Sequence, residues 1–194
     1  MAYLNNADIL QQLKTDTRTC LAQAEELQQY TAAQLRQRPA ADSWSAVEVL
    51  HHLNYYAQYY LQAMESAMEH TADTTKQQYH PGWLGNYFTR IIGPRDEQGQ
   101  LPMSMPSPPD AVPPAPAGLD PQAELNAYLT HQQQLLLLLD QARHKDLGRI
   151  RVPITLTRFI RLKLGDTFRF VVAHQLRHHQ QIAAALVVVE AVAG

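Results

Sequence analysis

The chain has 194 residues, of which 45% are hydrophobic and 18% charged, and this composition is typical of one soluble globular domain or two very small ones. It excludes a collagen, an intrinsically disordered chain and a small disulfide-stabilised protein. Sixteen Lys and Arg residues against eighteen Asp and Glu residues give a formal net charge of −2, which argues against binding to nucleic acid phosphates.

Two long helices are predicted in the first part of the chain, over residues 7–38 and 45–70. The first segment lacks Pro and Gly, is rich in Gln, Glu and Ala, and ends at Pro39. The second opens with Ser45, followed three residues later by Glu48, which is the spacing of a capping box. Its apolar residues recur largely at helical spacing, so one face is expected to be buried. The short link makes these helices antiparallel neighbours.

Residues 72–119 differ in character from the helices on either side. One short helix is expected near Trp83, and the seven prolines between Pro102 and Pro116 argue against regular structure there. We interpret this segment as a crossover that wraps the helices in an extended, polyproline-like path. The alternative is a disordered hinge between two domains, although neither half alone has enough apolar surface to bury its helices.

Two further helices are predicted over residues 120–145 and 166–193. The first begins with Asp120 as the N-cap and Pro121 at the first helical position. Between the two helices, residues 150–156 alternate between apolar and polar side chains, which predicts an extended segment on the surface.

Four long helices in a single domain over residues 1–194 predict an all-α protein, a four-helix bundle with a long Pro-rich crossover between its second and third helices. The only cysteine, Cys20, cannot form an internal disulfide, which is typical of the reducing cytoplasm. The N-terminal residues lack the features of a secretory signal, and the longest apolar runs are too short to cross a bilayer. We therefore expect a cytoplasmic protein without a membrane span.

The nine histidines invite a metal-site interpretation, because neutral imidazole is a common ligand of transition metals. His174 and His178 are four residues apart and project from one face of the last predicted helix. A site needs a third ligand, and the second helix offers the pair His51 and His52. The alternative for each of these residues is a hydrogen-bonded or solvent-facing histidine without a metal.

Two motifs carry a resemblance to a known family. Trp44-Ser45-x-x-Glu48-Val49-Leu50-x-His52-Leu53 lies near the start of the second predicted helix, and His174-x-x-x-His178-x-x-Gln181-Ile182 lies near the end of the chain. Their order and their separation of roughly 120 residues resemble the paired signatures of the DinB-like superfamily. The resemblance covers the first, second and last predicted helices but not the Pro-rich crossover.

This resemblance implies a four-helix bundle of DinB-like type, often a homodimer, with a divalent metal ion. It implies the chemistry of metal-dependent hydrolases or of transferases that use a low-molecular-weight thiol such as bacillithiol or mycothiol. The metal ligands implied by it are His52, His174 and His178, and the neighbouring His51 and His179 then point elsewhere.

The function expected on this basis is that of a metal-dependent enzyme acting on an unknown small-molecule substrate. Three histidines leave a free position on the metal, as in catalytic sites. Zinc or nickel is the expected ion, and iron or manganese also accepts histidine ligands. The alternative is a non-catalytic DinB-like bundle that acts in dimerisation or partner binding. Neither nucleic acid nor membrane is expected as a partner.

Three further residues are weak candidates for a catalytic role. Glu48 lies one turn before His52, where it could orient an imidazole or take a proton, although its place in the capping box explains it without chemistry. Tyr56 lies one turn after His52 and belongs to a tyrosine cluster that is also typical of a core or interface. Gln181 follows His178 by three residues. Seven Lys and Arg residues between 149 and 177 form either an attractive surface for an anionic substrate or a solvated face.

Overall fold

Helices make up most of the chain in the computed structural model, which describes residues 2–74, 76–103, 106–155 and 157–193. None of the helices within these ranges is long and apolar enough to cross a membrane. The elements in chain order are β1 (Leu4–Asn5), α1 (Asn6–Glu26), α2 (Ala32–Arg36), α3 (Ala46–Glu69), β2 (Gln78–Tyr79), α4 (Trp83–Ile92), α5 (Pro121–Gln141), β3 (Arg151–Ile154), β4 (Thr157–Lys163) and α6 (Leu164–Ala193), with short 3-10 turns between several of them.

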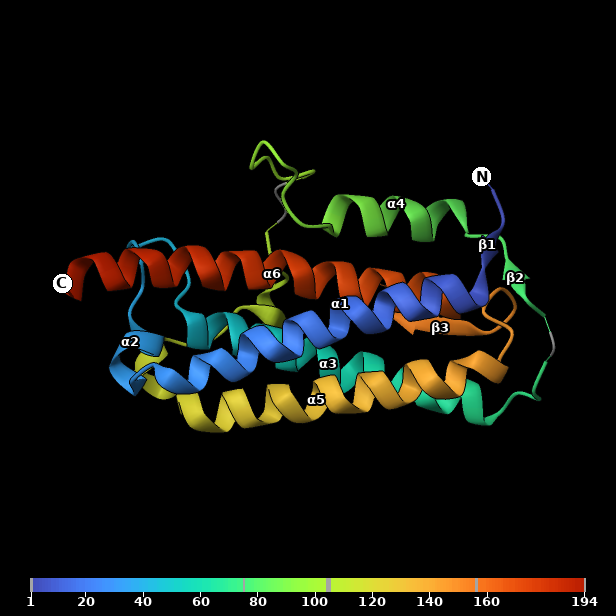
Figure 1. Ribbon diagram of the computed structural model, residues 1–194, viewed down its shortest axis with the longest axis horizontal. Helices are drawn as coiled ribbons and strands as arrows, with labels where there is room; N and C mark the ends of the chain where they lie inside the picture. Colours follow the sequence, from blue (N-terminus) through green and yellow to red (C-terminus); the bar gives the residue numbers. More distant parts are fainter. Residues whose placement is uncertain (1, 75, 104–105, 156, 194) are drawn as a thin grey trace.

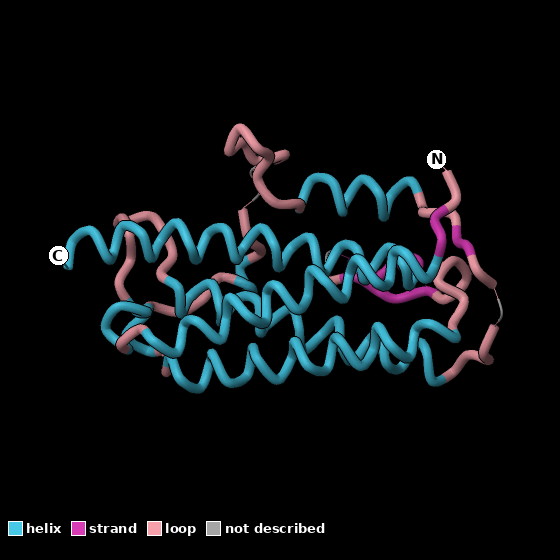
Figure 2. The backbone as a smooth tube through the Cα atoms, viewed as in Figure 1, coloured by secondary structure: helices cyan, strands magenta, loops and turns pink. Residues whose placement is uncertain are grey.

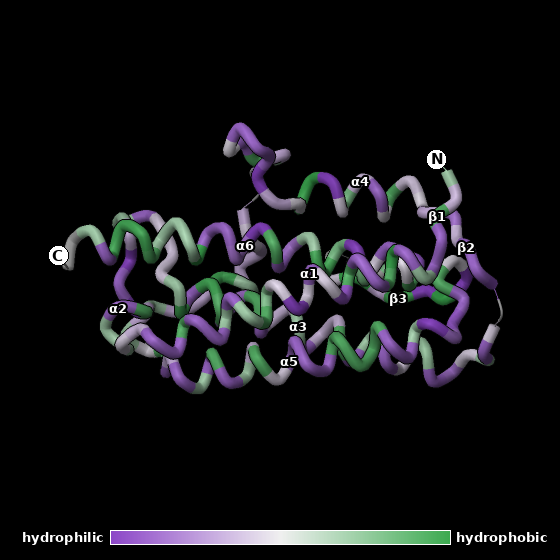
Figure 3. The backbone as a smooth tube through the Cα atoms, viewed as in Figure 1, coloured by the Kyte–Doolittle hydropathy of each residue, from purple (hydrophilic) through white to green (hydrophobic). Residues whose placement is uncertain are grey.

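The four long helices α1, α3, α5 and α6 lie side by side along the longest axis of the molecule (Figure 1). Helix α1 contacts α5 and α6, and α3 contacts the same two helices. Each of the four helices carries both polar and apolar residues along its length, as expected for helices that bury one face (Figure 3). The prediction of a mostly helical protein is confirmed.

The first predicted helix, over residues 7–38, is interrupted in the structure. Helix α1 ends at Glu26, a 3-10 turn follows, and Tyr30 adopts an extended conformation before α2 begins. The interruption has a local cause, because Thr31 and Gln34 form a capping box in which each side chain accepts a hydrogen bond from the other residue's backbone N–H. This box starts a new helix where the composition favours continuation of the old one.

Two short antiparallel strand pairs correct the all-α prediction in detail. Strand β1 pairs with β2, and β3 pairs with β4, both in the half of the molecule that holds the N-terminus (Figure 2). Of the segment predicted to be extended over residues 150–156, residues 151–154 form β3, one arm of a hairpin, whereas Ile150 and Thr155 lie outside the strand. Leu156 lies outside the described residues. The partner strand β4 was not predicted, and α6 begins at Leu164, two residues before the expected start. An extended backbone needs hydrogen-bond partners, which β4 supplies.

The segment between α3 and α5 contains more regular structure than the seven prolines predict. Helix α4 forms at the expected place near Trp83 and packs along α6. Two 3-10 turns begin at Pro109 and Pro116, because the fixed φ angle of proline suits the first position of a helical turn. The first of these turns contacts α3 and buries Ala111.

Buried polar residues divide the apolar core into two clusters. On α6, Val172 belongs to the larger cluster and Ile182 to the smaller one. Between these two positions, His174, Gln175, His178 and His179 are buried as well. A polar layer inside a core is costly unless its groups are satisfied, so this layer marks a candidate functional site.

Candidate metal centre

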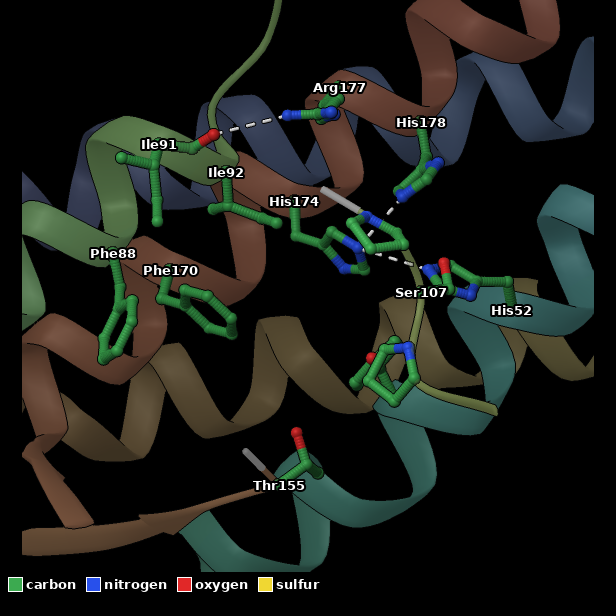
Figure 4. A pocket seen from close by; sticks show the side chains of 13 residues that line it. His52, Phe88, Ile91, Ile92, Ser107, Thr155, Phe170, His174, Arg177 and His178 are labelled. Atoms are coloured by element: carbon green, nitrogen blue, oxygen red, sulfur yellow. Dashed lines mark hydrogen bonds between the residues drawn. The ribbon is translucent and has the colours of Figure 1, made fainter. Parts of the chain in front are cut away.

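Three histidines from two helices converge between the apolar clusters. His52 comes from α3, and His174 and His178 come from successive turns of α6. The Nε2 atom of His174 lies 3.4 Å from Nε2 of His52 and 2.9 Å from Nε2 of His178. One nitrogen of each ring lies within 4.8 Å of the others, and no side chain is more than 9% exposed. The three rings point toward one another (Figure 4).

Hydrogen bonds on the outer side of two rings orient them toward this centre. Nδ1 of His52 donates to the backbone carbonyl of Ala111 over 2.8 Å, and Nδ1 of His178 donates to Oε1 of Gln181 over 2.8 Å. Because both partners are acceptors, the proton of each neutral ring sits on Nδ1 and the Nε2 lone pair faces the centre. Metal-bound histidines in proteins are oriented by such outer hydrogen bonds.

The donor set of the three rings fits a divalent cation. Nε2 of His174 carries at most one hydrogen, so it can donate a hydrogen bond to His52 or to His178 but not to both. The Nε2 lone pair of the other histidine is then buried in the cluster without a hydrogen. Burial and the nearby His178 and His52 lower the pKa of His174 well below its ordinary value, and burial with the nearby His52 lowers that of His178 to about 3. The rings are therefore neutral at pH 7, which is the form that binds a metal.

Aromatic side chains pack around the histidines. The ring of Trp44 lies 4.9 Å from that of His52 and 6.5 Å from that of His178, between ring centroids. The ring of Tyr56 lies 5.0 Å from His52 and 5.1 Å from His174. Phe170 stacks on His174 at 6.4 Å. These aromatic rings therefore contact all three imidazoles.

Two cavities meet at the histidine cluster. The inner cavity, of about 120 Å³, is walled by His52, His174 and apolar side chains from α4 and α6. The outer cavity, of about 620 Å³, includes exposed residues and so reaches the surface. The residues that line both cavities are Ser107, Arg177 and His178.

Two of the weak catalytic candidates lie at the site. Tyr56 lines the inner cavity, and burial, together with Tyr60 and Tyr55, raises its pKa to about 12. Its hydroxyl is therefore protonated at neutral pH and available as a donor. Gln181 lines the outer cavity and holds the His178 ring in place.

Glu48, the third candidate, lies in the capping box at the start of α3. Its carboxylate accepts hydrogen bonds from the backbone N–H and the hydroxyl of Ser45, each over 2.8 Å, and from the guanidinium of Arg38. Glu48 is not among the described residues that line the two cavities. Burial alone would raise its pKa, but the hydrogen bonds from Arg38 and Ser45 outweigh burial and hold the pKa below its ordinary value.

This geometry predicts that Glu48→Gln lowers the free energy of unfolding by about 1–3 kcal/mol at pH 7, because the buried charge-assisted hydrogen bonds are lost. A carboxylate whose pKa is depressed by folding stabilises the protein above the unfolded-state pKa of about 4.3 and loses this effect as the pH falls. Urea unfolding at pH 7 and near pH 3 checks both points. The exposed Glu25→Gln is the control, with a change within about 0.5 kcal/mol. If the difference in unfolding free energy between wild type and Glu48→Gln were as large near pH 3 as at pH 7, the Glu48 carboxylate would not be the source of this stability.

The histidines next to the cluster make other contacts. Nδ1 of His51 lies 2.8 Å from a carboxylate oxygen of Glu124 on α5, and Nε2 of His179 forms a hydrogen bond of 2.7 Å with the Tyr128 hydroxyl. Both rings point away from the cluster, as the resemblance implied.

Sequence reasoning missed the carbonyl of Ala111 and the packing role of Trp44. A backbone carbonyl carries no side-chain signal, and the prolines of its segment predict no regular structure there. Trp44 stood in the first motif, but only the fold places its ring against two histidines.

Comparison with known protein families gives a match over most of the chain. Residues 12–182 match the sequence profile of the DinB superfamily, which is well over half of the chain. No curated protein and no solved structure shows a significant match.

Proposed function

The chain belongs to the DinB superfamily, and we propose that it is a metal-dependent enzyme whose divalent ion is bound by His52, His174 and His178. The observation that carries this proposal is the convergence of three buried, neutral imidazoles, with Nε2 of His174 within 3.4 Å of Nε2 of His52 and 2.9 Å of Nε2 of His178. We further propose that the four long helices form the four-helix bundle of this family in one domain, with residues 72–119 as the crossover.

Zinc or nickel is the proposed ion, because all three donors are imidazole nitrogens, and three protein ligands leave a position for water or substrate. When bound, the ion lowers the pKa of a water molecule to about 7 or holds a thiolate, so hydrolysis and thiol transfer are both within its chemistry. The donor set suits either reaction.

The surrounding residues have distinct roles in this proposal. Ala111 and Gln181 hold the His52 and His178 rings through their Nδ1 hydrogens. The protonated hydroxyl of Tyr56 donates a hydrogen bond to a polar atom of the substrate in the inner cavity. The apolar wall, which includes Phe170, excludes water from the reacting group.

The test starts with untagged protein purified without added metal. We expect one divalent ion per chain by inductively coupled plasma mass spectrometry. The metal-loaded protein is then assayed with a panel of esters and amides and with electrophiles plus small thiols. Turnover that requires the ion assigns the reaction class. Protein that neither contains metal nor takes up zinc or nickel would overturn the proposal and leave the alternative of a non-catalytic bundle for dimerisation or partner binding.

We propose a cytoplasmic homodimer with a small-molecule substrate, on the basis of family membership and of the buried, unpaired Cys20.

A further inference from the structure

Arg177 occupies a central place between the two cavities. It follows His174 by three residues on α6 and directly precedes His178. Its Nη1 donates to the backbone carbonyl of Ile91 over 3.3 Å (Figure 4). The same Nη1 donates to the backbone carbonyl of Met103 over 3.0 Å. Within the described ranges no Asp or Glu forms an ion pair with it. A half-buried guanidinium thus has only neutral partners there.

A second arginine, Arg95, lines the same outer cavity, and its guanidinium Nη1 donates to the backbone carbonyl of Gly99 over 2.8 Å, which is a neutral partner. The Arg95 backbone N–H donates to Oε1 of Gln180 over 2.7 Å, which ties this loop to α6. Burial and the repulsion from Arg95 lower the pKa of Arg177. The described wall of the outer cavity also contains one carboxylate, Asp42, which forms no ion pair with either arginine. Two cations against one anion leave this wall positive.

The inner cavity has the opposite character. Phe88, Ile91, Ile92 and Phe170 supply apolar surface beside His174, and Arg177 is the only ionised side chain among the described residues of this wall. A ligand that spans both cavities therefore meets an apolar chamber at one end and guanidinium groups at the other.

We propose that the substrate is a small anionic molecule whose carboxylate or phosphate is bound by Arg177 and Arg95, with its apolar end in the inner cavity beside His174. Guanidinium groups bind both anions through paired N–H donors. The reaction of such a substrate rests on the proposed function, but the anion site itself consists of protein groups and exists without the metal.

Probe binding to metal-free protein tests the anion site. The protein is dialysed against a chelator, and isothermal titration calorimetry follows phenylacetate, benzyl phosphate and the neutral phenylacetamide. We expect at least one anion to bind about tenfold or more tightly than the amide, because hydrogen bonds to charged groups are stronger than those to neutral ones. The preferred anion distinguishes a carboxylate substrate from a phosphate substrate.

Variants assign the preference to these arginines. Arg177→Gln is expected to reduce the tenfold preference to about twofold, and Arg95→Gln to reduce it partly. Arg177→Lys keeps the charge and is expected to keep most of the preference. If thermal unfolding shows that Arg177→Gln is misfolded, Arg95→Gln carries the test of lost preference. Arg161→Gln removes an exposed positive charge from β4 and serves as the matched control without effect. Equal binding of anions and amide by wild type, or a preference that survives both Gln variants, would overturn the inference.

Zinc uptake by the same samples separates the two proposals. Wild-type protein that prefers anions but does not bind zinc would retain the anion site and refute the metal-dependent function. Zinc binding without anion preference would refute only the anion site. Arg177→Gln is expected to bind zinc as wild type does, because Arg177 donates no hydrogen bond to the histidine rings.

Discussion

His178→Ala is expected to remove metal binding from this protein. The substitution deletes one of three converging nitrogens and leaves His52 and His174, which come from different helices and hold a divalent ion weakly. Loss of a residue that merely orients a metal-bound histidine costs about 10- to 100-fold in affinity, so loss of the ligand itself costs more. Mass spectrometry of purified protein and zinc competition with a chromophoric chelator measure this effect.

Two further variants make the result specific. Gln181→Leu keeps all three ligands but removes the acceptor of the His178 Nδ1 hydrogen, and we expect affinity to fall about 10- to 100-fold. His51→Ala is the matched control, because His51 contacts Glu124 and lies outside the cluster, so affinity should match that of wild type. Equal zinc affinity in wild type and His178→Ala would exclude the three-histidine centre.

Gly85→Ala is expected to lower the free energy of unfolding by about 2 kcal/mol or more. Gly85 lies where α4 packs against the start of α6, and an added Cβ there would lie 2.4 Å from Cβ of Asp166. That atom is attached directly to the α6 backbone, so it cannot rotate away. The gain of about 1 kcal/mol in helix propensity only partly offsets this overlap.

Thermal unfolding checks this prediction. For a chain of this length, 1 kcal/mol corresponds to about 2–4 °C, so Gly85→Ala should lower Tm by about 4 °C or more. Gly118→Ala is the control, since a Cβ there meets no atom within 4 Å, and its Tm should be unchanged. If both variants unfold at the wild-type temperature, α4 is not packed on α6 as described. The result bears on the site, because α4 supplies Phe88 and Ile91 to the inner cavity.

The candidate site could be predicted from sequence as far as local spacing reaches. His174 and His178 share a helical face because they are four residues apart, and this holds in almost any helix. The capping box of Ser45 and Glu48 follows from their spacing in the same way. The choice between His51 and His52 did not follow from spacing, and only the family resemblance pointed to His52.

Where local signals compete, the sequence pattern was misleading. The leucines before Pro39 favour a continuous helix, but the capping box at Thr31 breaks it. The alternating residues after Arg149 indicate an extended segment without revealing that β4 is its partner. Hydrophobic spacing reports which face is buried and not which element buries it.

The sequence by itself determined the long helical segments, their caps and the pair of histidines on α6, because these depend on residues within one or two turns. Tertiary structure decided that His52 reaches that pair across 122 positions, and that the carbonyl of Ala111 orients it. It also placed Arg177 and Arg95 on one cavity wall. Such contacts depend on how separate segments pack in space, and the packing of the whole core determines this rather than the spacing within any one helix.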